Sequence, residues 1–98
     1  MRFEIALAPE AAQTLKGLPA FHRTTIRDAL ETHLRHEPAK VSKSRIKRLR
    51  GLSQPQYRLR IEEFRVFYDI SVQEVQILAI VSKEEAEAWL SKHGVIEP

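Results

Sequence analysis

Three consecutive segments between residues 56 and 81 carry the residue pattern of β-strands, and they constrain the fold more than any other part of the chain. Hydrophobic and polar residues alternate in segments 56–61 and 64–70, as expected for strands with one buried face. Only two glutamates separate these segments, so they should form a hairpin. Segment 75–81 is hydrophobic on both faces, with Val75, Ile77 and Ala79 on one face and Leu78 and Ile80 on the other, which is typical of a central strand. The sequence therefore predicts a sheet that is largely antiparallel.

The residues that precede these strands predict one more strand and two helices. Residues 2–7 alternate and indicate a strand. Pro9 suits the first turn of a helix, which Gly17 and the proline at position 19 then end. A second helix is expected from about Phe21 to His36, because its hydrophobic residues recur at spacings of three and four. The two helices should form an antiparallel hairpin.

A last helix is predicted for residues 83–93, with Ser82 as its N-cap and Glu85 at the capping-box position. The basic connection between the helical hairpin and the strands reads as irregular, apart from a short extended piece around residues 46–49. The element order is then β-α-α-β-β-β-α. It predicts an α+β fold with a twisted, antiparallel-rich sheet, one face packed on helices and the other open.

Length and composition favour a small cytoplasmic domain. The 98 residues allow one domain, which we predict to span residues 1–98. The absence of cysteine excludes disulfides and thiolate metal sites. The N-terminus lacks the hydrophobic core of a signal peptide, and the longest hydrophobic run, residues 77–81, is far too short to cross a membrane. We expect a soluble protein without a cofactor or metal.

Positive charge is concentrated in the middle of the chain. Residues 40–65 contain nine Lys or Arg and two Glu, a net charge of +7, whereas residues 1–39 are neutral and residues 66–98 carry −4. Such a block is typical of a surface that binds phosphates. A solvated charged surface without a ligand is the alternative.

Three arginines in this block should share one face of the sheet. Arg58 and Arg60 are two residues apart on one strand, so their side chains project in the same direction. Arg65 lies on the outward face of the adjacent strand. Planar guanidinium groups bind phosphates through paired hydrogen bonds. The phosphates that we expect this surface to bind are those of RNA. The other residues expected to contact RNA are Lys43, Arg45, Lys47, Arg48, Arg50 and Phe67. Phe67 should either stack on a base or pack under a neighbouring element.

The sequence contains no nucleophile motif, no glycine-rich phosphate-binding loop and no pair of carboxylates with catalytic spacing. The four histidines lie on or at the ends of predicted helices, and the pair His33 and His36 has no evident third metal ligand. RNA cleavage needs none of these motifs, because the ribose 2′-OH is an internal nucleophile beside its own phosphate. Cations placed around that phosphate accelerate the attack, and a lysine within such a cluster could act as base. The arginine face is therefore compatible with a ribonuclease.

The chain resembles the RelE/ParE superfamily of bacterial toxins from toxin–antitoxin pairs over nearly its whole length. The resemblance rests on three stretches in order: Lys47-Arg48-Leu49-Arg50-Gly51-Leu52, then Tyr57-Arg58-Leu59-Arg60, then Phe64-Arg65-Val66-Phe67-Tyr68. Each stretch alone is a weak signal, and the three together are fairly specific. The resemblance implies a RelE-like fold and a cognate antitoxin as partner.

Within the RelE branch, the toxin enters the ribosomal A site and cuts mRNA by 2′-OH attack. That resemblance implies catalytic roles for Arg58 and Arg60 in proton removal or substrate alignment, and for Arg65 in stabilising the reacting phosphate. Lys83 would stand for a further arginine of that branch. Trp89 would either stack in place of a C-terminal tyrosine or pack in the core. Arginines here replace lysines of the RelE branch, which leaves the general base unassigned.

Three functions therefore follow as alternatives. The first is a ribosome-dependent mRNA endonuclease that inhibits translation. The second is a ParE-like inhibitor of DNA gyrase without nuclease activity, suggested by the departures from the RelE pattern near the C-terminus. The third is an RNA-binding module that does not cut. For the two toxins, we expect an acidic antitoxin on the exposed sheet face and the outer surface of helix 83–93.

Overall fold

A five-stranded sheet forms the centre of the computed structural model, which describes residues 1–98. Its strands are β1 (Glu4–Leu7), β2 (Ile46–Arg48), β4 (Tyr57–Ile61), β5 (Phe64–Ile70) and β6 (Glu74–Ser82), in the spatial order β1-β6-β5-β4-β2. The pair β1–β6 is parallel and the other pairs are antiparallel. The predicted α+β fold with an antiparallel-rich sheet is confirmed.

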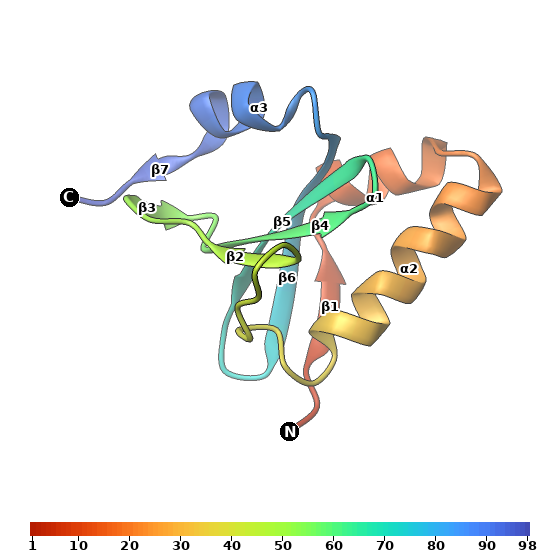
Figure 1. The fold of residues 1–98 in the computed structure, drawn as a ribbon, viewed down its shortest axis with the longest axis horizontal. Coiled ribbons are helices and arrows are strands. Elements are labelled where there is room, and N and C mark those ends of the chain that lie inside the picture. Colours follow the sequence, from red (N-terminus) through yellow and green to blue (C-terminus); the bar gives the residue numbers. More distant parts are fainter.

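Three helices and a small second sheet complete the fold. They are α1 (Pro9–Gly17), α2 (Ala20–Leu34), α3 (Ala86–His93) and the pair β3 (Leu52–Gln54) and β7 (Val95–Ile96). Figure 1 shows α1 and α2 together on one side of the sheet, whereas α3 lies away from them with β7 and β3. No helix combines the length and the hydrophobicity that a membrane span requires.

The main core lies between helices α1 and α2 and the sheet. Helices α1 and α2 contribute Ala11, Leu15, Ile26, Leu30 and Leu34, all buried. The sheet contributes Ile46, Leu59, Ile61, Val66, Tyr68, Val75, Ile77 and Ile80. These are the hydrophobic positions of the alternating strands, so burying one face of each amphipathic element stabilises the fold.

Tyr68 carries the one polar group of this cluster of side chains, and its hydroxyl donates a hydrogen bond to the Pro38 carbonyl at 2.7 Å. Burial raises the pKa of Tyr68 above its ordinary value, so the hydroxyl stays protonated as a donor. Tyr68→Phe should leave the Pro38 carbonyl without this donor and lower stability by roughly 1 kcal/mol, or about 4–8 °C in Tm. Thermal melts monitored by circular dichroism test this, with the exposed Phe21→Tyr as a control; an unchanged Tm contradicts it.

A β-bulge in β6 changes the predicted facing of its residues. The register pairs Phe67 with Ala79 but Tyr68 with Ile77, so Leu78 is an extra residue. As a result Ile80 lies with Ile77 in the main core, and Ala79 faces the opposite side beside Phe67. The strict alternation predicted for residues 75–81, with Ala79 and Ile77 on one face, is therefore wrong beyond Ile77.

The C-terminal segment also differs from the prediction. Helix α3 begins at Ala86, three residues later than expected, with Glu85 at its N-cap position. The Ser82 hydroxyl lies 2.9 Å from the Glu85 carboxylate rather than capping a backbone N–H. The small β3–β7 sheet was not predicted, because both strands are too short to show an alternation.

Candidate functional site

The strand register places the three predicted arginines on the sheet face that points away from the main core. Arg60 on β4 pairs with Arg65 on β5, and Arg58 pairs with Phe67. Leu59 between the two β4 arginines is buried in the core, as alternation requires. Directly opposite residues have Cβ atoms about 4.5–5.5 Å apart, so the guanidinium groups can converge on one anion. We refer to Arg58, Arg60 and Arg65 as the arginine cluster.

No carboxylate neutralises the arginine cluster. The ion pairs of the structure join Arg35 to Glu31, Lys40 to Glu37 and Lys83 to Glu63, and none includes Arg58, Arg60 or Arg65. Like charges close together raise the free energy of the site until a counterion arrives. The cluster is therefore suited to bind a phosphate.

Arg58 is the most constrained member of the cluster. Its Nε atom is buried and has no hydrogen-bond partner. Burial lowers the pKa of Arg58, and the neighbouring charges of Arg65 and Arg60 lower it further. An unpartnered buried donor is rare in folded proteins and often marks a functional site.

One side of the Arg65 guanidinium is held by hydrogen bonds within the protein, and the other side has no protein partner. Its Nη1 atom donates to the carbonyls of Glu62 and Phe64, at 2.8 and 2.9 Å. These bonds hold the β4–β5 turn, where Glu62 has a φ of 50°. The structure shows no protein acceptor for Nη2 or Nε, so this edge of the guanidinium remains available for an anion.

Arg60 is exposed and stands at the edge of the cluster. Its side chain lines a hollow of about 360 Å³ together with Thr25 of α2 and Arg45. Burial lowers the pKa of His33, and the charge of Arg45 lowers it further. The arginine cluster thus continues toward the basic connection that precedes β2.

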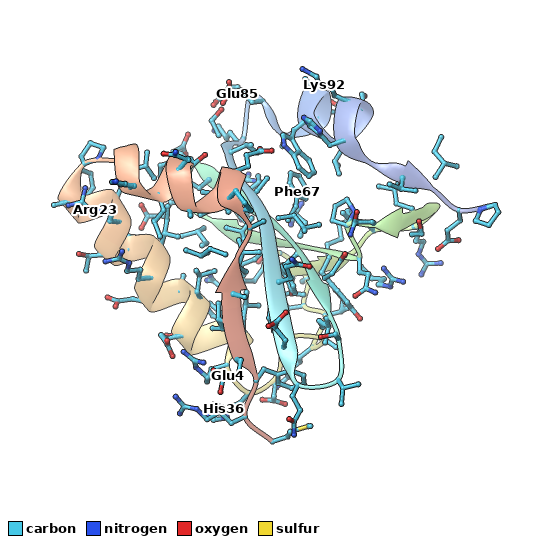
Figure 2. All side chains as sticks on the ribbon, turned by 180° about the vertical axis from the view of Figure 1, so that it is seen from behind. Glu4, Arg23, His36, Phe67, Glu85 and Lys92 are labelled. Atoms are coloured by element: carbon cyan, nitrogen blue, oxygen red, sulfur yellow. The ribbon has the colours of Figure 1, made fainter.

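Phe67 points to the predicted face, and of its two predicted roles the structure shows packing under a neighbouring element rather than a ring open to a base. Its ring is fully buried, because the Trp89 indole of α3 stacks on it at 5.0 Å with an angle of 7° between the planes. The indole Nε1 donates to the Glu10 carboxylate at 2.7 Å, and the His93 ring packs 4.9 Å from the indole. Figure 2 shows Phe67 beneath α3. The sheet face predicted to be open is therefore partly covered.

Lys83 differs from the arginines because it has a partner. Its Nζ lies 3.2 Å from a Glu63 carboxylate oxygen, and its backbone N–H donates to the Glu63 carbonyl. Both side chains of this ion pair are largely exposed, so the pair contributes little to stability. It nevertheless holds Lys83 at the β4–β5 turn.

The other predicted RNA-binding residues are distributed over two faces. Lys43, Arg45, Lys47, Arg48 and Arg50 are all exposed. Arg48 faces the core side, where its guanidinium lies 5.1 Å from the Tyr57 ring centre and donates to the Gln56 carbonyl. Lys47 pairs with Arg58 across β2 and β4, and so joins the arginine cluster. The sequence placed Lys47 in the basic connection, and only the strand pairing brings it beside Arg58.

Comparisons with known proteins agree with this fold. Residues 5–87 match the family model described as ParE toxin of type II toxin-antitoxin system, parDE. Among solved structures, the archaeal RelE–RelB complex from Pyrococcus horikoshii OT3 is similar, with 25% identity, a TM-score of 0.63, and coverage of 85% of this chain and 97% of that one. None of the curated proteins matches the chain.

Two further solved structures share the fold at lower identity. The RelBE2 toxin–antitoxin complex from Mycobacterium tuberculosis has 21% identity and a TM-score of 0.66, covering 85% of this chain and all of that one. The YoeB dimer from Staphylococcus aureus has 18% identity and a TM-score of 0.57, covering 81% of this chain and 94% of that one.

Proposed function

This chain belongs to the ParE toxin family of type II toxin–antitoxin systems, within the RelE/ParE superfamily, and for this member of the superfamily we propose cleavage of mRNA on the ribosome. The observation that carries the proposal is the arginine cluster, three like charges on one sheet face without a carboxylate partner. Such a cluster binds a phosphate more tightly as negative charge develops on the phosphate oxygens. Tighter binding of the transition state than of the substrate is what accelerates nucleophilic attack on the phosphorus.

In the proposed reaction, the ribose 2′-OH attacks the adjacent phosphorus and the 5′-oxygen of the next nucleotide leaves. Arg58, Arg60 and Arg65 bind the non-bridging oxygens and align the attacking and leaving atoms. Charge on these oxygens increases in the transition state, so hydrogen bonds from fixed guanidinium groups stabilise it more than the ground state. Arg65 supplies its free edge while its Nη1 keeps the guanidinium in place.

The first test is 5′-end mapping of mRNA in a coupled translation reaction with purified protein. We expect new 5′ ends at a fixed position within codons, and none when ribosomes are omitted. If the purified protein is folded, the ribosomes are translating and the mRNA nevertheless stays intact, that result would falsify the endonuclease proposal. RNA that is bound but never cut would support the module that binds without cleavage.

DNA gyrase is the second candidate target. The family model describes a ParE toxin, and the burial of Phe67 under Trp89 removes an aromatic ring that could have stacked a base. A supercoiling assay distinguishes the two functions, because a gyrase inhibitor blocks supercoiling of relaxed plasmid and leaves mRNA intact. The endonuclease should have no effect on supercoiling.

We also propose an acidic antitoxin as partner, since the arginine cluster has no internal counterion. Two of the similar solved structures are complexes of a toxin with its antitoxin. The docking surfaces we expect are the uncovered part of the cluster's face and the outer surface of α3. An acidic protein encoded beside this chain should co-elute with it in gel filtration and stop its activity; separate elution contradicts the proposal.

A further inference from the structure

The pairing of β2 with β4 adds a fourth cation to the arginine cluster. Lys47 lies directly opposite Arg58, while its neighbour Ile46 lies opposite Leu59 and is buried in the main core. Alternation therefore puts Lys47 on the face of the arginine cluster, with its Cβ about 4.5–5.5 Å from that of Arg58. Because β2 is an edge strand and Lys47 is exposed, solvent and substrate can reach its amine.

The proposed reaction needs a group that accepts the proton of the 2′-OH, and the arginines do not provide one. A guanidinium remains protonated throughout the range in which proteins are stable. The amine of Lys83 is paired with Glu63, and the oxygens of Asp69 accept hydrogen bonds from the Gln54 side chain and the Gln56 N–H. Lys47 has no carboxylate partner.

The histidines are engaged in other contacts, including His93, which belongs to the helix that partly covers the face of the arginine cluster. His22 packs beside Phe64, His93 packs on Trp89, and His33 lines a hollow between α2 and the basic connection. His36 is at the end of α2 and near Glu4, at the opposite end of the molecule from α3 (Figure 2). Among these groups, Lys47 is the one that the strand register pairs directly with Arg58.

We propose that Lys47 is the general base of the mRNA cleavage, which makes this inference dependent on the proposed function. The neutral Lys47 amine takes the proton from the 2′-OH as the 2′-oxygen forms a bond to phosphorus. The bond from phosphorus to the 5′-oxygen breaks, and that oxygen takes a proton from water. The products are a 2′,3′-cyclic phosphate and a 5′-hydroxyl, and Lys47 returns its proton to solvent.

This role predicts a specific dependence of the cleavage rate on pH. A lysine base acts in its neutral form, so the cleavage rate should rise with pH. The charged groups that face Lys47 are Arg58 and Arg60 on β4, Arg65 on β5 and Arg45 before β2. All four are guanidinium cations, so none of them can accept a proton in place of Lys47.

The absence of cysteine allows a chemical test at this one position. Lys47→Cys introduces a single thiol, which 2-bromoethylamine converts into an aminoethyl side chain that closely matches lysine. Alkylation of the same variant with (2-bromoethyl)trimethylammonium supplies a permanent cation that cannot accept a proton. Single-turnover cleavage of translated mRNA is then measured for both products, for the unmodified variant and for wild type between about pH 6 and 8, within the range in which folded proteins tend to be most stable.

We expect Lys47→Cys to cleave at least about a hundredfold more slowly than wild type, within the range that general bases contribute. Aminoethylation should restore the rate and its rise with pH, whereas the trimethylammonium product should remain slow. Equal rescue by both cations would show that Lys47 contributes only charge and would overturn the proposal. Unmodified Lys47→Cys that cleaves mRNA as fast as wild type would also overturn the proposal. If wild type itself leaves mRNA intact, the proposed function fails instead, and this inference fails with it.

Discussion

Replacing Arg58 with methionine should abolish mRNA cleavage and at the same time raise the melting temperature of the protein. Arg58 is partly buried, its Nε has no hydrogen-bond partner, and Arg60 and Arg65 repel it. Methionine keeps the unbranched shape and removes the charge and the unsatisfied donor. We expect a gain of roughly 1 kcal/mol, or about 4–8 °C in Tm, together with a loss of cleavage of at least about a hundredfold.

Arg65→Met is the matched comparison for this result. It also removes a cation from the cluster, but it breaks the two hydrogen bonds that hold the β4–β5 turn. Both variants should lose cleavage, whereas only Arg65→Met should lower the Tm. Arg27→Met, at an exposed position of α2, should change neither quantity much. An Arg58→Met variant that is less stable than wild type, or that still cleaves mRNA, contradicts this interpretation of the cluster.

The second large effect is expected from Trp89→Ala. The indole stacks on Phe67 and donates to Glu10, and α3 has no fully buried residue of its own. Removing the indole should therefore release α3 and the β7 strand that follows it. We expect a loss of about 2–3 kcal/mol, near the lower end for a tryptophan truncation because the ring is partly exposed. Urea denaturation measures the loss, and amide hydrogen exchange shows whether α3 and β7 become unprotected.

Trp89→Phe provides the control for this prediction. It keeps an aromatic ring against Phe67 and loses the hydrogen bond to the exposed Glu10 carboxylate, so it should cost about 1 kcal/mol or less. Faster exchange confined to α3 and β7 in Trp89→Ala supports the role of the stack. If the amides of α1 and α2 exchange faster to the same extent, the indole stabilises the whole fold rather than the C-terminal segment.

The sequence by itself determined most of the fold. Alternation in residues 64–70 gave β5 with its bounds, and Pro9 and Gly17 gave both ends of α1, because these signals are local to the chain. The same alternation put Arg58, Arg60 and Arg65 on one face, since side-chain direction along a strand follows from the backbone alone. The net charge of residues 40–65 likewise follows from the sequence alone.

The tertiary structure decided which of these residues can meet a substrate. An extra residue at Leu78 reverses the facing of the residues that follow it, and a bulge depends on the pairing of two strands rather than on the pattern of one. Trp89 covers Phe67 from a helix 22 positions later in the chain, and β2 brings Lys47 opposite Arg58 through a register that its three residues do not encode. Contacts between distant segments depend on how the whole chain buries its hydrophobic surface, and no local pattern contains that information.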